Sequence, residues 1–173
     1  MKARHIRELI RDVPDFPKPG IVFKDITPVL ADPEALRGTL ELMAELAGPL
    51  NPEIIAGPES RGFIFGTGLA SVMGLGFVPI RKPGKLPWRT RSVSYELEYG
   101  TDSLEIHEDA VFEGQRVIIV DDLLATGGTM AAACELIEGL RASVVGCLFL
   151  VELAFLKGRD RIAPRPAHSI IDY

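Results

Sequence analysis

The sequence of 173 residues has little of several features that mark other classes of protein. Its two cysteines, Cys134 and Cys147, lie in apolar runs without metal-ligand spacing, which favours small buried hydrophobic residues over a redox pair. Its three histidines are scattered and predict no metal site. No apolar run approaches the ~20 residues of a membrane-spanning helix. The charged N-terminal segment does not resemble a signal peptide, so we expect a cytoplasmic protein.

An excess of basic residues is also missing, since 19 Lys and Arg stand against 24 Asp and Glu, for a net charge of −5. Non-specific binding of nucleic acid or of an anionic membrane needs a basic surface, so we expect neither partner. An anionic small molecule can still bind where positive charge gathers locally. The length and the absence of repeats predict a single domain over residues 1–173.

Short apolar strands alternate with helices through most of the chain. This alternation predicts an α/β fold, with a mostly parallel sheet and helices on both faces. The expected strands are Ile54–Ala56, Phe77–Ile80, Val117–Val120, Val144–Leu150 and Ser169–Ile171, and the expected helices between them are Phe63–Met73 and Thr129–Leu140. The segment GPESRG, which follows the first of these strands, is expected to be a loop.

The N-terminal region and the middle of the chain add further elements. Apolar residues at helical spacing predict a helix that ends at Pro14, followed by an extended segment, Ile21–Phe23. Asp32 before Pro33 is typical of a helix start. That helix is expected to bury Leu36, Leu40, Met43 and Leu46. A polar loop over 81–92 precedes a predicted hairpin with arms Ser94–Tyr99 and Leu104–His107.

The segment Val117–Thr129, VIIVDDLLATGGT, has the composition of a phosphate site. Small residues and glycines in Ala125–Thr129 (Ala125, Thr126, Gly127, Gly128, Thr129) let backbone N–H groups approach an oxyanion, and the following helix N-terminus adds unpaired donors. The segment is neither a Walker loop nor a dinucleotide loop, because it lacks the Gly-Lys-Ser/Thr and GxGxxG patterns. It predicts a phosphate cradle; the alternative is an ordinary N-capped helix after a strand.

Two carboxylates, Asp121 and Asp122, precede this cradle. A carboxylate accepts hydrogen bonds from two hydroxyl groups of a diol, whereas it would repel a bare phosphate. A diol site beside a phosphate site predicts a ribose 5-phosphate as ligand.

These thirteen residues resemble the signature of phosphoribosyltransferases that use phosphoribosyl pyrophosphate (PRPP). Five further segments are similar to the adenine-specific family of these enzymes, and the resemblance covers Pro14 to about Pro164. They are PDFPKPGIVFKDITPVL, GPESRGFIFG, IRKPGKLP, SYELEYGTDSLEIH, and AACELIEGL running on to LVEL.

The resemblance implies that adenine and PRPP give AMP and pyrophosphate, with Mg²⁺ bound through PRPP rather than by a metal site of the protein. It also implies the type I phosphoribosyltransferase fold, with a five-stranded parallel core. A small hood over the base, at about residues 1–35, and a lid formed by the basic loop and hairpin, at about 81–107, complete that fold. A homodimer is implied as well, in which Arg81 reaches the partner's site.

The leaving pyrophosphate needs local positive charge. Five basic residues and no acidic one occupy 81–91, although a solvated basic loop would look the same. Ser60 and Arg61 follow a buried strand, and a guanidinium matches a phosphate bidentately, so Arg61 is also a catalytic candidate; otherwise Arg61 is a surface residue. The predicted pyrophosphate residues are Ser60, Arg61, Arg81, Lys82 and Lys85.

The resemblance places adenine against the backbone of Val22 and Lys24, where many relatives carry Arg in place of Lys24. Phe23 is either a platform for the base or a core aromatic. Glu98 is the candidate acid–base residue for the proton that leaves N9, because neighbouring tyrosines can desolvate its carboxyl, and a solvated hairpin glutamate is the alternative. Trp88 is either a latch in the lid or an ordinary loop residue.

Two other functions compete with this prediction. A phosphoribosyltransferase for another purine would lack the hood motif PDFPKPGIVFKDI. A PRPP-sensing regulator would bind without turnover and would carry a basic face or an added DNA-binding region, for which this acidic chain has no room.

Overall fold

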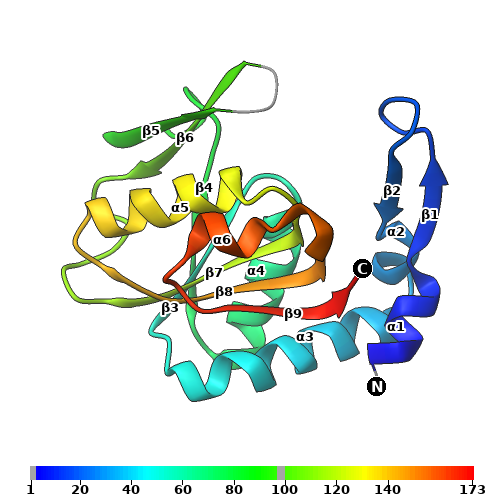
Figure 1. The fold of residues 1–173 in the computed structure, drawn as a ribbon. Helices are drawn as coiled ribbons and strands as arrows, with labels where there is room; N and C mark the ends of the chain where they lie inside the picture. Colours follow the sequence, from blue (N-terminus) through cyan, green and yellow to red (C-terminus); the bar gives the residue numbers. More distant parts are fainter. Residues whose placement is uncertain (1–2, 97–99) are drawn as a thin grey trace.

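The computed structural model describes residues 3–96 and 100–173, and its centre is a five-stranded sheet (Figure 1). All neighbouring strands in this sheet pair in parallel. In spatial order they are β4 (Gly76–Ile80), β3 (Ile54–Pro58), β7 (Arg116–Leu124), β8 (Ser143–Glu152) and β9 (Ala167–Asp172). The predicted parallel α/β core is confirmed.

Helices cover both faces of the sheet. Ile118 and Val120 of β7 belong to one apolar core, whereas Val117 and Ile119 belong to the other, as the alternation of a strand buried on both faces requires. The first core is covered by α1 (Ala3–Leu9), α2 (Thr27–Ala31), α3 (Pro33–Ala47) and α4 (Arg61–Met73), and the second by α5 (Gly128–Gly139) and α6 (Gly158–Ile162). None of these helices is long and apolar enough to span a bilayer, in the part of the chain that the structure describes.

The N-terminal helix is shorter than predicted. It ends at Leu9, and β1 (Arg11–Pro14) then pairs antiparallel with β2 (Val22–Asp25). Ile6 and Ile10 are buried as the helical spacing indicated, but Val13 lies in the strand opposite Phe23. Val13 continues the helical spacing of Ile6 and Ile10 only by coincidence. It is β-branched, and such a residue suits a half-buried strand well. The short helix α2 was not predicted.

The start of α3 is confirmed, because the Asp32 carboxylate accepts hydrogen bonds from the backbone N–H groups of Glu34 (2.9 Å) and Ala35 (2.8 Å). Its buried face differs from the prediction. Met43 is buried, but Leu36, Leu40 and Leu46 are only half-buried. The fully buried positions are mostly small, namely Ala35, Gly38, Thr39 and Ala47, and small residues let the helix approach the sheet closely. The short 3₁₀ helix η1 (Gly48–Leu50) follows at the predicted stop.

A second hairpin, β5 (Thr90–Glu96) with β6 (Thr101–His107), stands above α5 (Figure 1). It begins inside the predicted loop 81–92, and Thr101 and Asp102 lie in a strand rather than in the turn. Tyr95, Leu104 and Ile106 are buried in the same core as α5, and this packing extends the strands beyond the predicted arms. The hairpin therefore projects from the sheet as expected, on a buried apolar base.

The two cysteines are free and buried, as predicted. Their sulfur atoms lie 3.6 Å apart, on α5 and β8. The hydrogen bond to Cys134 and burial raise the pKa of Cys147, so this thiol stays protonated and apolar in character.

Candidate active site

The predicted phosphate cradle lies at the carboxyl end of β7, in the centre of the sheet. A cavity of about 210 Å³ is lined by Asp121, Asp122, Ala125–Thr129 and Arg61. All seven residues predicted for ribose 5-phosphate therefore border one space. The strand itself runs to Leu124 instead of ending at Val120, because β8 continues beside it to Glu152. The aspartates are thus the end of a strand and not the start of a loop.

The cradle needs glycine at its turn. Gly127 has φ +82° immediately before α5, a conformation that L side chains rarely adopt. A Cβ at this position would also lie 2.5 Å from the carbonyl oxygen of Gly158, at the start of α6. Gly158 in turn leaves no room for a Cβ against the carbonyl oxygen of Ala125. Two chain segments therefore meet backbone to backbone, and α6 supports the loop from behind.

The two carboxyl groups are close neighbours. The backbone N–H of Asp122 donates to Oδ1 of Asp121 at 2.9 Å. Burial of the Asp121 carboxyl, together with the charge of Asp122, raises the pKa of Asp121 well above its ordinary value. Hydroxyl donors or a cation would favour the ionised form, so this carboxyl is suited to a ligand that supplies such groups.

Arg61 connects the cradle to the neighbouring strand. It is the first residue of α4, not a loop residue, because Gly57 and Pro58 belong to β3 and only Glu59 and Ser60 lie between. The Glu59–Ser60 peptide bond is cis. Nε of Arg61 lies 2.5 Å from Oδ2 of Asp122. Although burial opposes it, the charge of Asp122 raises the pKa of Arg61.

A second cavity of about 270 Å³ continues from the cradle and shares Arg61, both aspartates and Thr129 with it. Its other lining residues are Glu59, Ser60, Lys82, Tyr95 and Asp102. Lys82 pairs with Asp102, and the Tyr95 hydroxyl lies 3.2 Å from Asp102 and 3.3 Å from the Thr129 hydroxyl. Three predicted pyrophosphate residues, Ser60, Arg61 and Lys82, are therefore brought together.

The other two predicted pyrophosphate residues do not line either cavity. The guanidinium of Arg81 lies 3.4 Å from the Glu59 carboxylate and also donates to the carbonyl oxygen of Lys85 at 3.2 Å. Lys85 is exposed. Arg81 instead holds Glu59, whose carboxylate also accepts the Lys82 N–H at 2.6 Å, in place beside the cavity.

A third cavity, of about 620 Å³, lies between the N-terminal hairpin and the end of the sheet. The predicted base residues Val22 and Lys24 line it, as does Thr126 of the cradle, so the two spaces are adjacent. Phe23 does not line this cavity; it is half-buried and lies edge-on to Phe16, with the Arg61 guanidinium 6.0 Å from its ring centroid. The remaining lining residues are Asp12, Gly20, Ile21, Leu153, Phe155, Leu156 and Tyr173.

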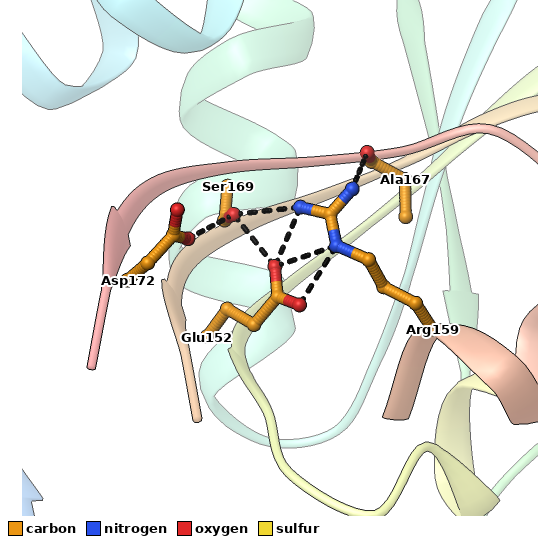
Figure 2. Close-up of polar contacts among 5 residues, drawn as sticks. All are labelled: Glu152, Arg159, Ala167, Ser169 and Asp172. Carbon is orange, nitrogen blue, oxygen red and sulfur yellow. Dashed lines mark hydrogen bonds and ion pairs between the residues drawn. The ribbon is translucent and has the colours of Figure 1, made fainter. Parts of the chain in front are cut away.

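The far wall of the third cavity depends on an ion pair whose carboxylate is buried (Figure 2). Glu152 ends β8, and its side chain is only 6% exposed. Arg159 of α6 donates to both of its carboxylate oxygens, at 2.6 to 2.9 Å, and to the carbonyl oxygen of Ala167 at 2.6 Å. The Ser169 hydroxyl adds a bond of 2.7 Å. This network fixes the strand end from which η2 (Ala154–Leu156) and the cavity wall follow.

Sequence reasoning missed several residues of these cavities. Asp102 was expected in a turn, although its position opposite Tyr95 follows once the hairpin register is known. The sequence gives no reason to assign a role to Leu153, Phe155 or Tyr173, except that Leu153 belongs to the motif segment LVEL. Glu98, the predicted acid–base residue, lies outside the residues that the structure describes. Trp88 is exposed, and its backbone N–H donates to Nε2 of His107 at 3.3 Å.

Comparison with known proteins agrees with this geometry. The family model described as phosphoribosyl transferase domain matches residues 26–171. An adenine phosphoribosyltransferase from Synechococcus is 55% identical over 168 residues, covering 97% of this chain and 98% of the relative. The crystal structure of adenine phosphoribosyltransferase from Thermoanaerobacter pseudethanolicus has a TM-score of 0.97 at 55% identity, covering 99% of this chain and 100% of that one.

A third comparison includes ligands. The enzyme of the same name from Saccharomyces cerevisiae, solved with adenine and an imino-altritol bisphosphate, has a TM-score of 0.91 at 42% identity, with 97% of each chain covered. With the cradle, the paired aspartates and the adjoining cavity in place, these matches show that the chain belongs to the phosphoribosyltransferase family, among the adenine phosphoribosyltransferases.

Proposed function

We propose that this chain transfers the 5-phosphoribosyl group of PRPP to adenine, giving AMP and pyrophosphate in purine salvage. One observation carries the proposal: Thr126 borders both the phosphate cradle and the cavity beneath the hood. A ribose 5-phosphate in the first space and a flat base in the second would be neighbours, as formation of an N-glycosidic bond requires.

Each part of PRPP would be bound by protein groups of complementary charge. Backbone N–H groups of Ala125–Thr129, at the N-terminus of α5, would bind the 5′-phosphate. Asp121 and Asp122 would accept hydrogen bonds from the ribose hydroxyls. Arg61 and Lys82 would bind the pyrophosphate once it displaces their present partners, Asp122 and Asp102. Both cations would then lie where negative charge grows as the bond from C1′ to the pyrophosphate oxygen breaks.

The acid–base step would fall to Glu98. As N9 of adenine bonds to C1′, its proton must leave, and a partly desolvated carboxylate is suited to accept it. This assignment rests on the resemblance of SYELEYG to the family and on the neighbouring tyrosines. The hairpin that carries Glu98 would act as the lid that excludes water from the reacting PRPP.

A divalent cation fits the chemistry of this site. No group of three or more His, Cys, Asp or Glu side chains that could hold a metal ion occurs within residues 3–96 and 100–173. Mg²⁺ is commonly held by one or two carboxylates together with substrate phosphates, so Asp121 or Asp122 would complete a shell supplied mainly by PRPP. The ion would neutralise charge on the pyrophosphate when bound.

A substrate panel tests the reaction. Purified protein is incubated with PRPP, Mg²⁺ and one base at a time, namely adenine, hypoxanthine, guanine or xanthine, and pyrophosphate release is measured. We expect release with adenine and little with the others. Faster release with hypoxanthine would indicate an enzyme for another purine, whereas PRPP binding without release would indicate a regulator.

We further propose a cytoplasmic homodimer in which Arg81 approaches the partner's site. The support is the family resemblance, together with the free, buried cysteines of a reducing compartment for the location. Sedimentation equilibrium tests the assembly, and a monomeric mass at assay concentration would refute it. Fractionation of the native cells tests the location, and recovery of the activity outside the cytoplasmic fraction would refute that part.

A further inference from the structure

Tyr173 contributes to the base cavity in a way that the family motifs do not indicate. It follows β9, and its half-buried side chain borders the same cavity as Val22 and Lys24. The hood and the end of the sheet therefore meet at this residue. Figure 1 shows the hood standing beside the end of β9.

The backbone of Tyr173 is held on the body of the protein. Its N–H donates to the carbonyl oxygen of Glu152 at 2.9 Å, and its carbonyl oxygen accepts from the N–H of Ala154 at 2.9 Å. Glu152 is itself fixed by Arg159 (Figure 2). The ring therefore projects from a rigid strand end, and it provides a fixed surface against which another element can be positioned.

The hood contacts this ring through cations. Nζ of Lys24, on β2, lies 3.8 Å from the ring centroid, and the guanidinium of Arg7, on α1, lies 4.4 Å from it. The Lys24 side chain is only 13% exposed, and its ammonium also lies 2.6 Å from the Asp12 carboxylate. A cation over an aromatic face is attracted by the ring quadrupole, and more strongly when water is removed.

We propose that Tyr173 is a positioning residue for the purine base. By holding Lys24, the ring sets the distance between the β2 backbone and the wall formed by Leu153–Leu156, and so the width of the slot for a flat base. The Lys24 ammonium is already paired with the Asp12 carboxylate and the Tyr173 ring. The slot therefore offers the base no unpaired lysine charge and suits an uncharged aminopurine. This inference rests on the proposed function and adds a determinant of its base site.

The test separates adenine binding from the rest of catalysis. Tyr173→Leu removes the ring that holds β2 in place, and we expect the KM for adenine to rise about tenfold, which corresponds to ~1.4 kcal/mol of binding free energy. The kcat and the KM for PRPP should stay within about twofold, because Tyr173 lines neither the cradle cavity nor the second cavity. Tyr173→Phe keeps the ring face and should recover most of the adenine affinity. Phe112→Leu, at an exposed phenylalanine between β6 and β7, is the matched control.

The partner residue gives a second test. Lys24→Met should raise the KM for adenine to a similar extent, and the double variant should raise it little further, since both changes remove one interaction. Lys24→Arg, which keeps a cation, should bind adenine better than Lys24→Met. This pair of variants decides the question if Tyr173→Leu does not fold.

An unchanged KM for adenine in Tyr173→Leu would overturn the inference. So would equal losses for adenine and PRPP, additive effects in the double variant, or equal KM values in Lys24→Met and Lys24→Arg. Absence of pyrophosphate release by the unaltered protein with adenine is a different result, because it refutes the proposed function itself.

Discussion

Replacing Arg159 with methionine should destabilise the protein strongly, because it leaves Glu152 buried without its cation. The guanidinium makes five hydrogen bonds, three to Glu152 and one each to the Ala167 carbonyl oxygen and the Ser169 hydroxyl (Figure 2). The Glu152 side chain is 6% exposed, so water replaces its three hydrogen bonds poorly. Methionine keeps the apolar stem of the side chain, and the change therefore isolates the charge.

The magnitude follows from this geometry. Removing one partner of a buried pair costs about 3–5 kcal/mol. Arg159 is 46% exposed and Glu152 retains the Ser169 hydroxyl, so we expect the low end of that range, about 3 kcal/mol. For a domain of this size that corresponds to a fall in Tm of roughly 6–12 °C. Urea unfolding at pH 7.5, monitored by circular dichroism, measures the loss.

Two further variants make the comparison specific. Arg141→Met breaks an ion pair with Glu113, 3.3 Å long, in which both side chains are exposed, and it should cost about 1 kcal/mol or less. Adding Glu152→Met to Arg159→Met removes the stranded charge and should recover part of the stability. The recovery would show that the uncompensated carboxylate, and not the lost packing of Arg159, causes the destabilisation.

The pH dependence has a defined sign. The hydrogen bonds from Arg159 lower the pKa of Glu152, so the pair contributes stability above the unfolded-state value of roughly 4.3 and loses it as the pH falls through the lower folded value. In Arg159→Met, burial without the cation should instead raise the pKa of Glu152. The loss of unfolding free energy caused by Arg159→Met should therefore be smaller at pH 4 than at pH 7. The reasoning would be refuted if this loss were the same at pH 4 and pH 7. It would also be refuted if the loss were no larger than that caused by Arg141→Met.

Three other changes test the catalytic machinery. Gly158→Ala places a Cβ against the Ala125 carbonyl oxygen, so the cradle must shift and the KM for PRPP should rise about tenfold or more, whereas Gly48→Ala, with open space, should leave it unchanged. Asp122→Asn weakens both the ribose acceptor and the Arg61 pair, and an unchanged KM for PRPP would contradict that role. Glu98→Gln should lower kcat about 100-fold and remove one limb of the pH–rate profile, and wild-type turnover would end its assignment as the acid–base residue.

The sequence alone determined the cradle and the core strands, because their geometry depends on consecutive residues. Residues 117–120 are all apolar and β-branched, which indicates a strand buried on both faces. Ala125–Thr129 has the backbone freedom and the following helix N-terminus that a phosphate loop needs. The helix cap at Asp32 could be predicted for the same reason, since it needs only one side chain and the N–H groups of the two residues after Pro33.

The tertiary structure decided which charges are paired and which residues close the third cavity. The sequence presents five cations in 81–91, but only packing pairs Arg81 with Glu59 and Lys82 with Asp102. The third cavity joins β2 to Tyr173, about 150 residues later in the chain. No local pattern contains such a contact, because it exists only once β9 adds to the edge of the sheet and brings Tyr173, the residue after the strand, beside the hood.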